Sequence, residues 1–126
     1  MEVLYFQLDG APYAFPLPAI ADVAPAGHIH AVPLSPPAIL GLAECRGRAI
    51  AVIDLPSLLN AGHAGARSNA HLMRLAGPLH GAAFLVPSAI FSGRAMPADA
   101  GHVFIDGHLH VLLDPEALVK RAGAFD

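Results

Sequence analysis

Residues 39–59 read Ile-Leu-Gly-Leu-Ala-Glu-Cys-Arg-Gly-Arg-Ala-Ile-Ala-Val-Ile-Asp-Leu-Pro-Ser-Leu-Leu. Two short apolar runs flank the polar break Arg46-Gly47-Arg48, the second run ends at Asp54, and a leucine-rich segment follows. This order predicts a strand, a tight turn, a second strand and the start of a helix. Gly47 can take the positive φ that short hairpin loops often require, and Asp54 is placed to cap the helix, with Pro56 in its first turn.

The N-terminus carries a second hairpin signal. Residues 3–8 alternate between apolar and polar side chains, Asp9-Gly10 is a strong turn pair, and the alternation resumes at residues 13–17. We therefore predict a hairpin here. The following residues 19–23 are expected to form one helical turn or an irregular crossing, and residues 28–32 a short exposed strand.

The second half of the chain repeats the pattern of the first. Residues 71–77 resemble residues 4–10, residues 82–90 resemble 14–20, and residues 107–118 resemble 47–58. In the last of these, Asp114 takes the capping position before another proline. We interpret residues 1–126 as a single domain with two copies of one β-unit: subdomain 1 at about 1–60, a linker at about 60–70, and an abbreviated subdomain 2 at about 71–123.

Composition narrows the class of protein. Hydrophobic residues make up 55% of the 126 residues, which is enough for a packed core, while 12 Gly and 12 Pro favour short strands over long helices. With a formal charge of −3 and only seven Lys and Arg, the chain has no basic stripe, so nucleic acid and acidic membranes are poor partners. The single cysteine, Cys45, and the lack of a long apolar run favour a cytoplasmic protein without membrane insertion.

Eight histidines raise the question of a metal site, above all the pairs His28 and His30 and His108 and His110, because residues two apart on a strand project to one side. Zinc usually needs further ligands and second-shell support, so we interpret these histidines mainly as solvent-facing and keep metal binding as a weak alternative. No phosphate loop, nucleophile elbow or catalytic carboxylate pair is present, which predicts a protein that is not an enzyme and uses no cofactor.

The order of signals resembles the CheW-like domain of bacterial chemotaxis coupling proteins. That family carries an Ile-x-Asp/Glu-Val segment, a proline-bearing connector, and a Pro-x-x-Ile-x-Gly-x-x-x-x-Arg-Gly-x-x-x-x-Val-Ile-Asp-Leu signature. The matching residues here are Ile20-Ala-Asp22-Val23, Val32-Pro33, Pro36-Pro37-Ala38-Ile39-Leu40-Gly41, Arg46-Gly47 and Val52-Ile53-Asp54-Leu55. The specific part of the match lies in the first half of the chain.

The resemblance implies an all-β fold with two SH3-like β-barrel subdomains packed on a common hydrophobic core, with short helical segments. It also implies a non-enzymatic adaptor that couples the cytoplasmic tip of a methyl-accepting chemoreceptor to the regulatory domain of the histidine kinase CheA. Ile20, Asp22, Gly41 and Arg46 match positions near the receptor groove, with Asp22 expected to pair with Arg46. We interpret Gly47, Asp54, Leu55 and Asp114 as the structural signature.

Three departures from the family pattern bear on partners: the chain is short, the connector of its second unit is cut, and Val86-Pro87 replaces a frequent Val-Asp. One kinase contact is therefore expected to be weak or absent. A shortened second barrel could also be completed by strand exchange in a homodimer. The alternative function is a degenerate CheW-like domain that binds a metal or small ligand through its histidines.

Overall fold

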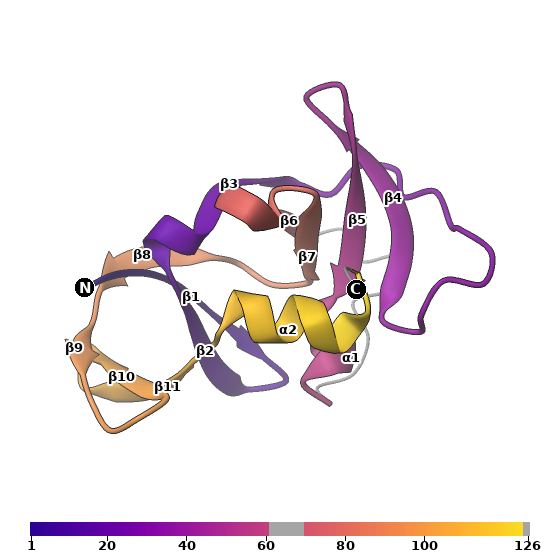
Figure 1. Ribbon diagram of the computed structural model, residues 1–126. Helices are drawn as coiled ribbons and strands as arrows, with labels where there is room; N and C mark the ends of the chain where they lie inside the picture. Colours follow the sequence, from indigo (N-terminus) through magenta and orange to yellow (C-terminus); the bar gives the residue numbers. More distant parts are fainter. Residues whose placement is uncertain (61–69, 125–126) are drawn as a thin grey trace.

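The computed structural model describes residues 1–60 and 70–124, which form two curled antiparallel-rich sheets with short helices (Figure 1). The first sheet has the strand order β8 (Phe91–Arg94), β1 (Glu2–Leu8), β2 (Ala11–Pro16), β11 (His108–Leu112), β10 (His102–Ile105) and β9 (Met96–Pro97). The second has the order β3 (Ile20–Pro25), β6 (His71–Leu75), β7 (Ala82–Val86), β5 (Arg48–Asp54) and β4 (Ile39–Cys45). The helical segments are α1 (Leu55–Leu58), α2 (Pro115–Ala122) and the 3-10 turns η1 (Leu17–Ala19) and η2 (Gly77–Leu79). The predicted all-β class is confirmed.

The tight turns and helix starts form where the sequence predicts them. Asp9-Gly10 and Arg46-Gly47 connect their strands with positive φ at both residues, 52° and 80° in the first turn and 52° and 78° in the second. Two positive φ values in a two-residue loop are the geometry whose twist matches that of the flanking strands. The side chain of Asp54 accepts a hydrogen bond from the Ser57 N–H, as a helix cap does.

Two local predictions are wrong. Residues 19–23 do not form a helical turn, because residues from Ile20 to Pro25 pair as strand β3 with β6, with a register shift between Ile20 and Asp22. Residues 28–32 do not form a strand, because only His30 bridges to Leu42. In the first case the pairing partner lies about fifty residues further along the chain, so local sequence does not reveal it.

The two sheets do not follow the predicted subdomains 1–60 and 71–123. The N-terminal hairpin β1–β2 joins β10–β11 through the parallel pair β2–β11, while the hairpin β6–β7 joins β4–β5 through the parallel pair β5–β7. Each sheet therefore combines the hairpin of one repeat with the strand pair of the other. Most of the predicted linker, residues 61–69, lies outside the described residues.

A shared core joins the two sheets. Phe15 on β2 and Phe84 on β7 are fully buried and stack with ring centroids 5.3 Å apart and planes 6° from parallel. Leu55 of α1 and Val119 of α2 are buried in the same core. Each ring contributes a large apolar area to the interface, so the predicted common hydrophobic core is confirmed and both sheets depend on it. Among the described residues, no helix is long and apolar enough to cross a membrane.

Candidate functional site

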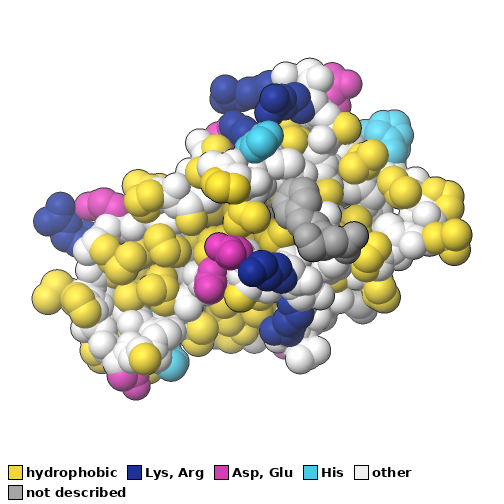
Figure 2. Space-filling view, in the orientation of Figure 1, with side chains coloured by type: hydrophobic (Ala, Val, Ile, Leu, Met, Phe, Trp, Pro, Cys, Tyr) yellow, Lys and Arg dark blue, Asp and Glu magenta, His cyan; other side chains and the backbone are white. Residues whose placement is uncertain are grey.

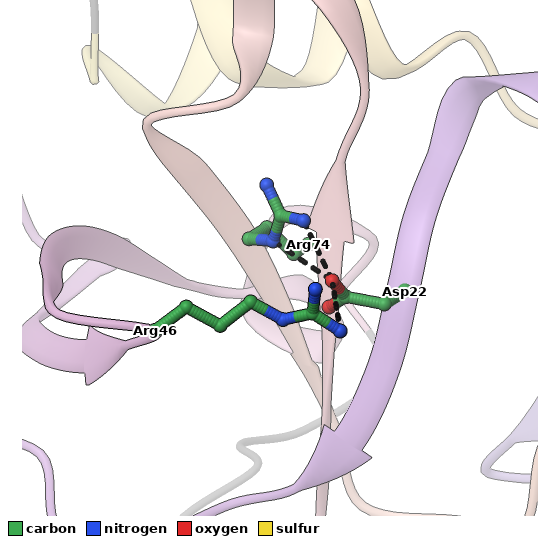
Figure 3. Close-up of polar contacts among 3 residues, drawn as sticks. All are labelled: Asp22, Arg46 and Arg74. Carbon is green, nitrogen blue, oxygen red and sulfur yellow. Dashed lines mark hydrogen bonds and ion pairs between the residues drawn. The ribbon is translucent and has the colours of Figure 1, made fainter.

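The predicted partner-binding residue Asp22 lies on β3 and is held by an arginine that the sequence analysis did not single out. Arg74 of β6 donates from Nε and Nη2 to Asp22 Oδ2, at 3.1 Å and 2.6 Å (Figure 3). The two residues are direct partners in the antiparallel register. The hydrogen bond from Arg74 to Asp22 raises the pKa of Arg74, although burial acts in the opposite direction, so Arg74 stays protonated.

Arg46 approaches the same carboxylate more loosely. Its Nη2 lies 3.7 Å from Asp22 Oδ2, which is an ion-pair distance but too long for a hydrogen bond, and its side chain is 79% exposed. The predicted pairing of Asp22 with Arg46 is thus only a secondary contact. The reason is geometric, because Arg46 sits in the β4–β5 turn while Arg74 faces Asp22 directly across the β3–β6 pair.

A hollow of about 460 Å³ opens beside this charge cluster, between β3 and β4. Its lining includes Asp22, Arg46, His28, His30 and Cys45. Figure 2 shows Lys and Arg side chains gathered over the tip of the β4–β5 hairpin, next to histidine and acidic side chains. The structure therefore brings four residues proposed from the sequence on different grounds, Asp22, Arg46, His28 and His30, to one concave, charged surface.

Gly41 does not line the hollow but shapes its wall. The backbones of His30 and Leu42 exchange two hydrogen bonds of 2.8 Å, and Gly41 has φ 149°. A Cβ at Gly41 would lie 2.0 Å from the carbonyl oxygen of His30. Only glycine allows this approach of the two backbones, so the role supported by the geometry is to hold the segment around His30 against β4.

Ile20 is too buried to contact a partner in the receptor groove directly. It is 8% exposed and packs in the shared core. Its neighbour across the sheet is Leu75, which is fully buried. Ile20 anchors the beginning of β3 and so supports the position of Asp22 two residues later.

The histidine pairs lie at different ends of the molecule. The rings of His28 and His30 are 4.3 Å apart between centroids at the hollow, whereas His108 and His110 are on β11 of the other sheet. His110 is only 7% exposed and meets the ring of Tyr5 edge-on, so the expectation that these histidines face solvent is wrong for His110, whereas His28, His30 and His108 are exposed. In residues 1–60 and 70–124, no group of three or more His, Cys, Asp and Glu side chains is arranged to hold a metal ion.

Comparison with known proteins agrees with this architecture. A model of the CheW-like domain matches residues 2–90. The chain belongs to the CheW-like domain family. The crystal structure of the scaffolding protein TtCheW from Thermoanaerobacter tengcongensis superimposes with a TM-score of 0.81 and 18% sequence identity, covering 94% of this chain and 92% of that one. This likeness extends the CheW fold, with its two SH3-like subdomains, over β8–β11 beyond the matched residues. No curated protein matches the sequence.

The residues predicted to be the structural signature of this CheW-like domain stabilise its turns, its helix starts and its core. Gly47 completes the β4–β5 turn, and Leu55 is fully buried in the shared core. Asp54 and Asp114 accept hydrogen bonds from the N–H groups of Ser57 and Glu116 at the starts of α1 and α2. These contacts are local consequences of turn and capping chemistry.

Sequence reasoning missed two features. Arg74 stands out as the one charged residue in the apolar run of β6, a signal that becomes informative only once β6 is known to pair with β3. The second feature is a row of exposed apolar side chains across β9, β10 and β11: Met96 is opposite Phe104, and Phe104 is opposite Leu109. Their exposures are 65%, 41% and 46%. The strands β9, β10 and β11 that carry this row lie at the end of the molecule away from the β4–β5 hairpin (Figure 1).

Proposed function

We propose that this CheW-like domain is a non-enzymatic signalling adaptor that couples a chemoreceptor to a CheA-type histidine kinase in chemotaxis or related motility signalling. Membership of the family and the two-sheet fold support this class of function. The observation that carries the proposal is the hollow between β3 and β4, with the exposed guanidinium of Arg46 at its rim. An adaptor of this kind binds through its surfaces and needs no cofactor.

On the receptor side, the hollow suits a polar side chain of the receptor's cytoplasmic tip. With 79% of its side chain exposed, Arg46 can offer N–H donors to a carboxylate or amide, and the edges of β3 and β4 supply apolar walls at Val23 and Ala43. Ile20 and Gly41 act from behind this surface, by fixing β3 and the segment around His30.

On the kinase side, the apolar row Met96, Phe104 and Leu109 offers a second and separate surface. Three apolar side chains in direct register form a continuous strip, and such a strip on a soluble domain marks an interaction site more often than an isolated exposed residue does. The two surfaces belong to different sheets, so one molecule can hold both partners at once.

The test is a titration of the full chain with a chemoreceptor tip fragment and, separately, with the regulatory domain of the kinase from the same source. Arg46→Ala is expected to weaken receptor binding by about three- to tenfold, the size of one partly exposed charged contact. Arg48→Ala, which removes an equal charge from the same hairpin, is the matched control and is expected to bind normally.

Phe104→Ser is the corresponding change in the apolar row, and it is expected to weaken kinase binding while leaving receptor binding unchanged. If neither partner binds the unaltered chain at high micromolar concentration, the adaptor proposal is wrong for this protein. If Arg46→Ala and Arg48→Ala lose equal receptor affinity, the net charge of the hairpin, and not the hollow, is responsible for receptor binding.

A further inference from the structure

Two arginines compete for one carboxylate oxygen in this domain. Arg74 places both Nε and Nη2 within hydrogen-bond distance of Asp22 Oδ2, at 3.1 Å and 2.6 Å, while Arg46 Nη2 stays at 3.7 Å from the same atom. Figure 3 shows the guanidinium groups reaching Asp22 from different elements. Among Asp22, Arg46 and Arg74, two positive charges meet one negative charge, so Asp22 leaves one positive charge unneutralised; the carboxylate of Glu44 also lines the hollow.

The structure explains why Arg74 holds the carboxylate. Asp22 and Arg74 face each other in the β3–β6 register, and their side chains are 28% and 20% exposed, so the pair is short and partly shielded from water. Arg46 must reach Asp22 from the β4–β5 turn with a side chain that is 79% exposed. Ordering a long, exposed side chain costs conformational entropy that a screened contact does not repay.

We infer that Arg74 is a positioning residue that determines which chemical group the hollow accepts: by occupying Asp22, it keeps the Arg46 guanidinium available for a carboxylate of the partner. This inference rests on the proposed function. Without Arg74, Arg46 would move from its long ion pair into direct hydrogen bonds with Asp22, and the rim of the hollow would present a neutral ion pair in place of a loosely held cation. The partner group that fits the observed arrangement is therefore an acidic side chain, Asp or Glu, rather than an amide.

The first experiment needs no partner. Solvent exchange of the side-chain Nε–H groups of Arg46 and Arg74 is measured by NMR in the unaltered chain and in Arg74→Met. In the unaltered chain, the Arg74 group is expected to exchange more slowly than that of Arg46. In Arg74→Met, exchange of the Arg46 group is expected to slow by about three- to tenfold, because Arg46 then bonds to Asp22. Unchanged exchange of Arg46 overturns the inference.

The second experiment measures binding of the chemoreceptor tip fragment. Arg74→Met is expected to weaken binding about as much as Arg46→Ala, and the double variant is expected to be no weaker than Arg46→Ala alone, because Arg74 acts only through Arg46. Additive losses would assign Arg74 a contact of its own and overturn the inference. Arg48→Ala again controls for the loss of one charge.

One further variant, Arg74→Lys, keeps the outcome decisive. Arg74→Lys retains the charge but not the two-bond geometry, so it is expected to give intermediate values in both experiments, and it replaces Arg74→Met if that variant unfolds at the assay temperature. If the unaltered chain binds no receptor fragment, the proposed function fails, while the exchange measurement still decides whether Arg74 displaces Arg46. The exchange measurement thus tests the role of Arg74, and the binding of the unaltered chain tests the proposed adaptor function.

Discussion

At the scale of single residues, two kinds of site residue are distinguished by what surrounds them. Arg46 is exposed, and its ion pair with Asp22 in the described part of the chain is long, so its guanidinium is available to a partner. Gly41 and Ile20 are enclosed, one by the His30 backbone and the other by the shared core. Both kinds occur in the same short signature, which explains why sequence position alone did not separate contact from support.

Gly41→Ala is expected to lower the free energy of unfolding by about 2–4 kcal/mol, because the added Cβ meets a backbone oxygen and the residue keeps a strained positive φ. Gly27→Ala is the control, since a Cβ there meets no atom within 4 Å, and its effect is expected to stay within about 0.5 kcal/mol. Urea denaturation measures both. Similar small effects at the two glycines would mean that the segment around His30 can move away from β4 without cost.

At the scale of elements, the two short helices begin in the same way but in different surroundings. Asp54 precedes α1 and is 2% exposed, whereas Asp114 precedes α2 at the surface. Each caps a helix whose first turn contains proline. The α2 helix also ends at Gly123 with φ 77°, in the left-handed conformation that glycine favours.

Removal of each cap is expected to destabilise the domain by different amounts. Asp114→Ala should lower the free energy of unfolding by about 1 kcal/mol and Asp54→Ala by about 2 kcal/mol, because the buried site gives the freed N–H groups less access to water. The measurement is chemical denaturation of each variant. Asn at either position keeps an acceptor and should recover most of the loss; an equal cost of the two Ala variants would contradict the role of burial.

At the scale of the whole molecule, each sheet is assembled from both halves of the chain. β2 needs β11 from near the C-terminus, and β5 needs β7 from beyond residue 70. The stacked rings of Phe15 and Phe84 then join the sheets. This arrangement exchanges strand pairs between two repeats within one chain, and the same exchange between two chains is the route by which a homodimer could form.

A fragment of residues 1–60 is therefore expected not to fold alone, because it contains β1–β2 and β4–β5 but lacks the strand that each pair needs. Circular dichroism of the fragment should show no cooperative thermal transition, and one should appear when a fragment of residues 61–126 is added. A cooperative transition of the fragment alone would support an independent first subdomain. A separate measurement of the molecular size of the full chain in solution tests whether it forms the strand-exchanged homodimer.

Much of the local structure was predictable. The turns at Asp9-Gly10 and Arg46-Gly47 and the cap at Asp54 follow from residue types that act on their immediate neighbours, and the family pattern at residues 36–55 correctly identified the fold. The β3 strand was not predictable in this way. Its alternation is weak, and it exists because β6 lies beside it.

The sequence by itself determined the repeated hairpins, the capped helices and the all-β class, because each depends on contacts between residues near one another in the chain. Only the tertiary structure decided which hairpin joins which strand pair and placed Arg74 opposite Asp22. The two repeats carry the same alternation, so local energies do not distinguish the pairings. The common core around Phe15 and Phe84 is buried only when both halves of the chain are assembled. In the described residues, this burial goes together with the observed pairing, in which each sheet takes strands from both halves.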